Sequence, residues 1–215
     1  MRMNEKMTQT EKTAVAGEER LSVGKSLVTA FVMMVFFTVV LGFVYPAVTT
    51  WVGGAIFSDK AEGSLIRDEA GRVIGSKLIG QNFENTGLFE GRPSATGEKP
   101  YNPMASSGTN MAQSNPDLQK AVKERSERWH KLTGNTAPVP MDLVTSSSSG
   151  LDPQISLDAA LYQVPYVAKK TGLSAEVLTK LARDCATSDP LAFGGVPLVN
   201  VLELNLKVIA LQKKK

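Results

Sequence analysis

The residues that could carry chemistry in this sequence are few, and their types restrict what they could do. His130 is the only histidine and Cys185 the only cysteine among the 215 residues. Zinc sites in proteins are built mainly from several His and Cys ligands, so one of each makes such a site implausible. A Ser-His-Asp hydrolase would have to combine His130 with the serine run at 146–149, and no G-x-S-x-G motif accompanies that run. We therefore predict no catalytic residues and no metal ligands.

Two further patterns suggest chemistry and have simpler explanations. Gly24, Lys25 and Ser26 resemble the end of a phosphate-binding loop, but the first glycine of that motif would fall at Glu19. The same three residues form the polar edge of a membrane span. The net charge of +3 comes from interspersed charges of both signs. We therefore expect no nucleic-acid partner.

The element that must position everything else is an apolar segment near the N-terminus. No charged side chain occurs from Ser26 to Ser58, and the run from Leu27 to Val48 is dominated by Val, Phe, Met and Leu. About 20 such residues cross a bilayer as a helix. The segment is too long and too uniformly apolar for a core helix or a cleaved signal peptide. We predict a transmembrane helix over 25–51 in which Pro46 lies in the last turn, and the lipid bilayer is the first expected partner.

Charge on the two sides of this segment predicts an orientation. The tail 1–24 is polar, carries most of the nearby Lys and Arg residues, and is predicted to be cytoplasmic and disordered. Residues 52–215 then form one extracytoplasmic domain, and the chain is a single-pass protein of a bacterial inner membrane. The lone cysteine is compatible with either compartment.

Helix signals recur along this domain, so we predict an α+β fold with several helices and a small β-sheet. Ser114, Asn115 and Pro116 form a helix start, and the apolar spacing continues to Gly134. Ser156 starts a second helix that Pro165 should interrupt or kink before it ends at Gly172, and Ser174 caps a third.

The remaining segments are less regular. Asp68–Gly71 is typical of a turn, and Arg72–Gln81 of a strand or short hairpin. We expect Gly87–Tyr101 to be an ordered irregular loop and Ala137–Gly150 a long loop. Apolar alternation after Leu202 suggests a strand, whereas the spacing of Asn200 and Glu203 suggests a capped helix, which we favour.

Seven segments together resemble one family, the C subunit of the Kdp-type potassium-transporting ATPase. They share their order and spacing with that family over roughly three quarters of the chain, and they are Gly75–Phe83, Phe89–Ala95, Ser106–Asn110, Asn115–Leu118, Pro138–Ser156, Ala159–Ala168 and Val199–Leu206. The chain departs from the family where Gln154 replaces an expected histidine and where Tyr166 replaces a common basic residue.

The resemblance implies a function and partners. The family is a non-catalytic accessory subunit of an ATP-driven pump for high-affinity potassium uptake. Its partners are a channel-like potassium-translocating subunit and a P-type ATPase catalytic subunit. No cofactor is expected on this chain itself, although the family is described as helping the catalytic subunit bind ATP. We expect a role in assembly or stability of the complex, and possible assistance to ATP binding follows from the family alone.

The resemblance also suggests which residues matter. Candidate nucleotide or partner contacts lie in one loop and on one helix, and they are Ser148, Ser149, Gly150, Asp152, Gln154 and Gln163. Backbone amides of this loop could hold an anion, but a structural turn packed against the pump is the reading we favour. Loops 91–95, 106–110 and 148–154 are the predicted contact surfaces. The alternative function is an anchored extracytoplasmic solute-binding or sensor domain.

Overall fold

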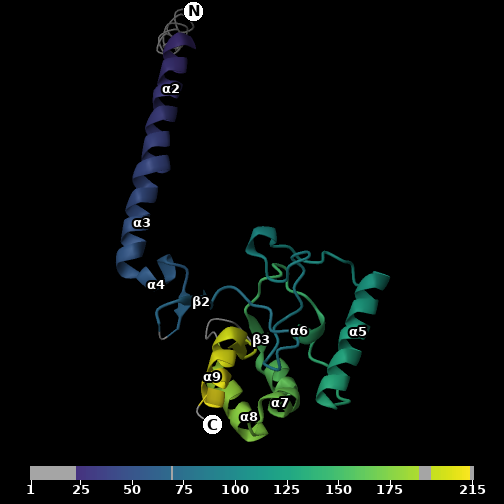
Figure 1. Cartoon of the computed structure of the whole chain (residues 1–215). Helices are drawn as coiled ribbons and strands as arrows, with labels where there is room; N and C mark the ends of the chain where they lie inside the picture. The colour runs from purple at the N-terminus through teal and green to yellow at the C-terminus, as the bar shows by residue number, and fades with distance from the viewer. Residues whose placement is uncertain (1–22, 69, 189–194, 214–215) are drawn as a thin grey trace, which may run out of the picture. The chain divides into compact units, whose positions relative to one another are not determined.

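The computed structural model describes residues 23–68, 70–188 and 195–213, and the chain divides into two units at residues 61 and 62 (Figure 1). The predicted tail 1–24 lies almost entirely outside the described residues. The predicted turn at Asp68–Gly71 includes one residue, 69, that is also outside them. Each unit has its own architecture: the first is helical, and the second is an α+β domain, as predicted.

The first unit is dominated by one apolar helix. Helix α2 (Val23–Val39), the π-helical segment η1 (Val40–Val44) and α3 (Tyr45–Ile56) run on without a break, and the short helix α4 (Ser58–Ala61) follows. The combined helix Val23–Ile56 has 34 residues and a mean hydropathy of 2.7, so it is long and apolar enough to cross a membrane. It extends beyond 25–51 at both ends.

Pro46 does not end this helix, because the π-helical segment accommodates it. Proline lacks an N–H, and its ring crowds the carbonyl of the residue four positions earlier, which here is Gly42. The N–H of Tyr45 donates to the carbonyl of Val40, five residues back, which is the π pattern. The helix therefore widens for one turn and continues to Ile56.

The second unit begins with a β-hairpin. Strand β1 (Leu65–Arg67) pairs antiparallel with β2 (Val73–Ser76). Asp68 organises the connection: its Oδ1 accepts hydrogen bonds from the N–H groups of Ala70 at 3.0 Å and Arg72 at 2.8 Å. The bond from the Arg72 amide is the main cause that lowers the pKa of Asp68. Of the segment Arg72–Gln81, which was predicted to be a strand or short hairpin, Val73–Ser76 is thus the second strand of a hairpin.

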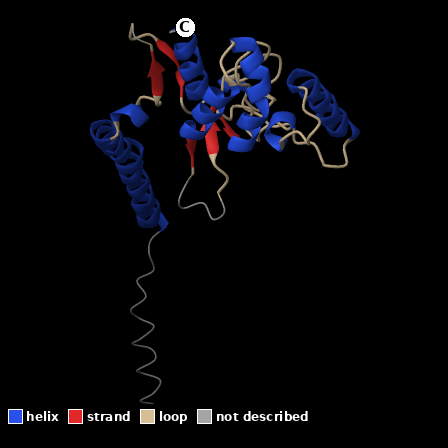
Figure 2. Cartoon of the chain, turned by 90° about the horizontal axis from the view of Figure 1, so that it is seen from below, coloured by secondary structure: helices blue, strands red, loops and turns tan. Residues whose placement is uncertain are grey.

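A second, three-stranded sheet joins distant parts of the domain. Strands β3 (Gln154–Ser156) and β4 (Ala186–Thr187) both pair antiparallel with the central strand β5 (Leu198–Asn200) (Figure 2). The sequence analysis predicted none of these three strands. Each has only two or three residues, which is too short for an alternating pattern to show.

Three helices begin where the sequence signals predicted, and the first two also end there. The helices are α5 (Pro116–Thr133), α7 (Leu157–Thr171) and α8 (Ala175–Cys185). Asn115, Ser156 and Ser174 cap them, each accepting a hydrogen bond from an N–H of the first turn. Gly134 and Gly172 end α5 and α7 in the left-handed conformation, with φ of 70° and 71°.

Two predictions about irregular structure were wrong in part. The loop at 137–150 contains a short helix, α6 (Met141–Val144), and a 3-10 turn η2 (Pro103–Ala105) lies in the preceding segment. Pro165 does not interrupt α7, which continues to Thr171. Pro165 is exposed, so water can hydrate the carbonyl that loses its donor.

The C-terminal segment forms helix α9 (Val201–Lys213), in agreement with the favoured prediction. The side chain of Asn200 accepts a hydrogen bond from the N–H of Glu203 at 3.2 Å, which is the capping bond that the spacing suggested. Leu204 and Val208 are fully buried one helical turn apart. The buried residues of this segment therefore recur with the spacing of a helix and not with the alternation of a strand.

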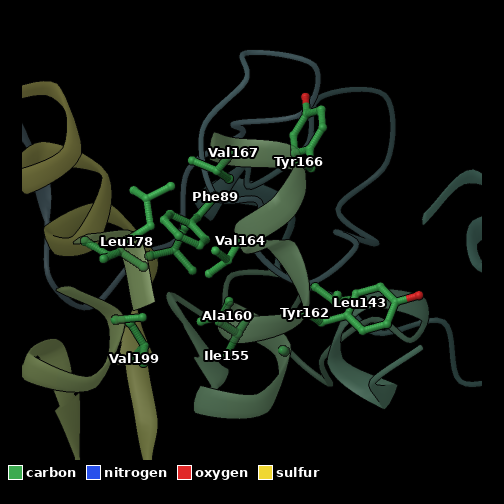
Figure 3. Close-up of a cluster of buried hydrophobic side chains, with 14 of the residues drawn as sticks. Phe89, Leu143, Ile155, Ala160, Tyr162, Val164, Tyr166, Val167, Leu178 and Val199 are labelled. Atoms are coloured by element: carbon green, nitrogen blue, oxygen red, sulfur yellow. The ribbon is translucent and has the colours of Figure 1, made fainter. Parts of the chain in front are cut away.

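The core lies between α7, α8, α9 and strand β5. Phe89 is its largest fully buried side chain and is surrounded by Val164, Val167 and Leu178 (Figure 3). Trp129 of α5 packs edge-on against Tyr166 of α7, with 6.1 Å between ring centroids. Cys185 lies at the margin of this core, half-buried, as a small apolar residue would.

Candidate functional site

Two fully buried amide side chains hold the start of the loop at 89–96. The N–H of Phe89 donates to Asn205 Oδ1 at 2.9 Å, and Asn205 Nδ2 donates to the Phe89 carbonyl at 2.8 Å. Gln163 forms the same pair of bonds with Glu90, at 2.7 and 3.0 Å. We call these four bonds the amide clasp. They replace a β-strand partner, because consecutive backbone groups in the core would otherwise be unpaired.

The Glu90 carboxylate forms an ion pair with α5. Arg128 Nη1 and Nη2 donate to its two oxygens, each at 2.8 Å, in the bidentate geometry that is strongest for this pair. Glu90 is 6 % exposed, so its charge is nearly buried and needs this partner. The hydrogen bonding of Arg128 to the Glu90 carboxylate is the main cause that raises the pKa of Arg128. The loop is thus fixed to α7 and α9 by the clasp and to α5 by charge.

The predicted loop at 148–154 is a compact turn whose conformation requires glycine. Gly150 has φ of +68°, and its N–H donates to Ser147 Oγ at 2.9 Å. A Cβ at this position would lie 2.7 Å from the carbonyl oxygen of Ser107 and 2.8 Å from a methyl of Thr96. Close approach of two other segments therefore excludes any side chain at residue 150.

Those contacts bring all three predicted contact loops together. Ser94 Oγ donates to the Gly150 carbonyl at 2.8 Å, which joins loop 91–95 to loop 148–154. The N–H of Ser107 donates to the Ser149 carbonyl at 3.0 Å, which joins loop 106–110 to the same turn. A Cβ on Gly108 would lie 2.8 Å from the Ser148 carbonyl oxygen. We call these three segments the loop cluster.

Tyr101 braces the loop cluster from the side. Its hydroxyl donates to the Arg92 carbonyl at 2.6 Å, and its N–H donates to Ser94 Oγ at 2.9 Å. Burial of the ring, with the charge of Asp152 nearby, raises the pKa of Tyr101 to about 12. A Cβ on Gly91 would lie 2.6 Å from the Tyr101 hydroxyl oxygen, so the backbone of the loop packs directly on this side chain.

Arg92 links the loop cluster to the segment around α6. Its guanidinium lies 3.8 Å from Asp142 and 3.6 Å from Asp152, and its Nη2 also donates to the Ser146 carbonyl at 3.3 Å. The other Asp142 oxygen accepts a bond from the N–H of Ser156 at 2.8 Å. Charge and hydrogen bonds therefore fix the turn on both sides.

The predicted site residues occupy different environments. Ser148 is exposed at the tip of the turn, Ser149 and Asp152 are half-buried, and Gly150 is buried. Gln154 is the first residue of β3.

Three backbone donors of this turn are already used within the chain. The N–H of Gly150 bonds Ser147, that of Leu151 bonds Ser149 Oγ at 3.1 Å, and that of Gln154 bonds Asp152 Oδ1 at 3.0 Å. Anion binding by backbone amides would need these groups to be free.

Gln163 lies away from the turn, in the core. It is 0 % exposed, and both of its amide atoms belong to the amide clasp. The clasp partner Asn205 and the Glu90–Arg128 pair were not predicted. The only sequence signal for them was that Glu90 and Asn205 fall in segments that resembled the family.

The loop cluster has the features of a contact surface. Across residues 23–68, 70–188 and 195–213, no three His, Cys, Asp or Glu side chains come together as metal ligands would. The loop cluster is instead a surface of small polar residues whose backbone is fixed by internal bonds. Rigid loops on a packed scaffold are the usual means of presenting a contact surface.

A helix long and apolar enough to span a membrane, followed by an α+β domain with such a surface, defines a class of candidate membrane subunits. A family model described as "K+-transporting ATPase, c chain" matches residues 27–210, which cover parts of both units. The chain therefore belongs to the KdpC family of potassium-transporting ATPase subunits, as the resemblance of the seven segments predicted.

Individual relatives agree with this assignment. The chain is similar to the "Potassium-transporting ATPase KdpC subunit" of Pectobacterium atrosepticum, with 52% identity over 78% of this chain and 87% of that protein. The subunit of the same name from Klebsiella pneumoniae subsp. pneumoniae is 48% identical over 86% and 97% of the two chains. That from Geotalea uraniireducens is 47% identical over 88% and 100%.

Proposed function

We propose that this chain is a non-catalytic accessory subunit of an ATP-driven potassium-uptake pump, and that its loop cluster docks on the other subunits and stabilises the complex. The convergence of loops 91–95, 106–110 and 148–154 is the observation that supports this role. Three segments distant in sequence are fixed against one another, so a partner would meet a pre-organised surface and little ordering entropy would be lost. The partners would be the channel-like subunit and the P-type catalytic subunit.

The domain belongs, on this proposal, to the extracytoplasmic side of the inner membrane. The helix Val23–Ile56 would be the single span, with the Lys- and Arg-rich residues before it in the cytoplasm. Since ATP is cytoplasmic, the domain would then influence ATP binding only indirectly, through the assembled complex. The engaged amides of Gly150, Leu151 and Gln154 also favour a structural use of the turn over a nucleotide contact.

Docking through the loop cluster can be tested with one exposed residue. Ser148→Arg places a large charged side chain at the tip of the turn, where it should leave the fold intact and block close approach of a partner. We expect the variant to be lost from the affinity-purified complex, whereas Gln212→Arg, at another exposed position, on α9, should be retained. Retention of both variants would refute docking through this cluster. A complex that stays intact while its KM for ATP rises would instead support a nucleotide role.

Topology can be tested by cysteine labelling. Lys131 is exposed on α5, so Lys131→Cys in a Cys185→Ala background offers one accessible thiol. We expect a membrane-impermeant maleimide to label it in intact spheroplasts. Labelling only after lysis would place the domain in the cytoplasm, on the side of the membrane where ATP is found. Direct assistance to nucleotide binding would then be the leading explanation.

A further inference from the structure

A cavity of about 200 Å³ lies beside the loop cluster, between α5 and the loop at 90–94. Its walls combine guanidinium groups with aromatic and proline surfaces, and they include Phe83, Arg92, Pro93, Tyr101, Arg125 and Arg128. Binding sites for drug-sized ligands occupy about 300–1,000 Å³, so this cavity is matched to a single side chain.

The three arginines of the cavity differ in how their charges are balanced. Arg128 is held by both oxygens of Glu90 at 2.8 Å, and Arg92 lies 3.6–3.8 Å from two aspartates. Arg125, by contrast, forms no ion pair with any residue in the described part of the chain. Its one hydrogen bond runs from Nη1 to the Val144 carbonyl, at 2.9 Å.

Arg125 is therefore a half-buried charge with unused donors. A guanidinium presents several N–H groups in a planar fork, and one backbone carbonyl occupies only part of it. Burial lowers the pKa of Arg125, and the charges of Glu124 and Glu84 act in the opposite direction. Glu84 and Glu90 lie 3.8 and 2.8 Å from Arg128, and Asp142 and Asp152 lie beside Arg92. Among the three arginines of the wall, only Arg125 therefore has no carboxylate within 4.0 Å in the described part of the chain.

We propose that this cavity receives the carboxylate of an acidic side chain from a loop of a partner subunit, and that Arg125 is its principal ligand. The proposal rests on the proposed function, because it requires the domain to dock on the pump. A carboxylate would complete the Arg125 fork in bidentate geometry. The aromatic and proline walls would contact the methylene groups and backbone of the inserted loop, which a free inorganic anion lacks. Charge complementarity thus selects an acidic peptide segment.

The test uses the whole complex and variants on one helix. Arg125→Glu should weaken retention of this subunit by about tenfold or more, since close charge pairs at interfaces couple strongly. Arg125→Gln, which can still donate to the Val144 carbonyl, should show a smaller loss. Lys123→Glu makes the same charge change at an exposed position two residues away and should have no effect. Retention is measured by pull-down through the catalytic subunit during a salt titration.

Rescue distinguishes lost docking from lost folding. Replacement of acidic residues in the exported partner loops by lysine should identify one change that restores retention of Arg125→Glu. Wild-type retention of both Arg125→Gln and Arg125→Glu would overturn the proposal. Calorimetric binding of acetate or phosphate to the wild-type chain, together with unaffected retention of Arg125→Glu, would make the cavity a small-anion site and would also overturn it. Loss of Ser148→Arg with retention of Arg125→Glu would leave docking through the loop cluster intact and reject only the cavity.

Discussion

Replacement of Gln163 by leucine tests whether the amide clasp is structural. The two side chains have similar volumes, so the substitution removes hydrogen bonds without opening a large cavity. It leaves the N–H and carbonyl of Glu90 without their partners at a position that is 6 % exposed. We expect the domain to fold but to lose much of its stability.

The size of the effect follows from those two groups. Each buried polar group left unsatisfied costs about 1–3 kcal/mol, or about 2–6 kcal/mol for both. Burial of the leucine side chain returns about 1.5–3 kcal/mol. A net loss of about 2 kcal/mol is a large share of the ~5–15 kcal/mol that stabilises an ordinary domain.

Urea unfolding of the full chain in detergent, followed by tryptophan fluorescence, can measure this loss. Trp129 is 2 % exposed and reports on the core, whereas Trp51 lies exposed in the apolar helix and is replaced by Phe in every variant. The control is Gln212→Leu, an exposed position on α9 where we expect a change within about 0.5 kcal/mol. Asn205→Leu removes the bonds to Phe89, the residue next to Glu90. The stability lost in the double variant should therefore be less than the sum of the two single losses.

Equal stability of Gln163→Leu and Gln212→Leu would refute the structural reading of the clasp. If the pump containing Gln163→Leu then showed a raised KM for ATP, the residue would be a nucleotide contact, as the sequence analysis allowed. A loss of stability with an unchanged KM in the surviving complex would assign Gln163 to the core alone.

Three further outcomes follow from the site. Gly150→Ala should lower the free energy of unfolding clearly more than Gly134→Ala in the same urea assay. Both positions have positive φ, which costs a residue with a Cβ about 1–2 kcal/mol, but only a Cβ at residue 150 would meet neighbouring atoms. Equal losses would contradict the packing of the turn. Tyr101 should ionise only near pH 12 in an absorbance titration. Because its pKa in the folded state exceeds the ordinary 10.0, the stability that it adds is present below pH 10 and is lost as the pH rises toward 12. Tyr101→Phe should abolish this pH dependence of stability. Glu90→Gln should lower the free energy of unfolding by about 1–3 kcal/mol, because the half-buried guanidinium of Arg128 loses its charged acceptor. The exposed control Glu127→Gln should leave stability unchanged. An unchanged stability of Glu90→Gln would show that the ion pair has no structural role.

Local signals in the sequence predicted the helices well. A cap side chain and a terminal glycine act within one helical turn, so Asn115, Ser156, Ser174 and Gly172 could be identified without knowledge of the fold. The apolar helix near the N-terminus was predictable for a similar reason, because length and composition alone decide it. Its boundaries and its π-helical segment were not predictable, since they depend on how the backbone accommodates Pro46.

The site depended on contacts that a sequence does not display. The three loops were predicted separately from their resemblance to one family, and only the structure shows that Ser94, Ser107 and Gly150 meet. Gln163 and Asn205 are polar residues on helices, which sequence reasoning places toward solvent or a ligand. Their burial follows from the Phe89–Glu90 backbone, which enters the core without a strand partner and needs side-chain amides instead.

The π-helical segment gives the apolar helix two different rotational phases. A π turn accommodates one extra residue, and each residue of an α-helix advances the side chains by roughly 100° about the axis. The side chains of Tyr45–Ile56 are therefore turned by about one residue relative to a straight continuation of Val23–Val39. If residues of this helix were cross-linked one by one to a neighbouring helix, the reactive positions should recur with helical spacing up to Val39. After Val44 the same spacing should return, displaced by one residue. Deletion of one residue from Val40–Val44 should bring the two sets of reactive positions into line, so the two halves of the span can address different neighbours while belonging to one continuous helix.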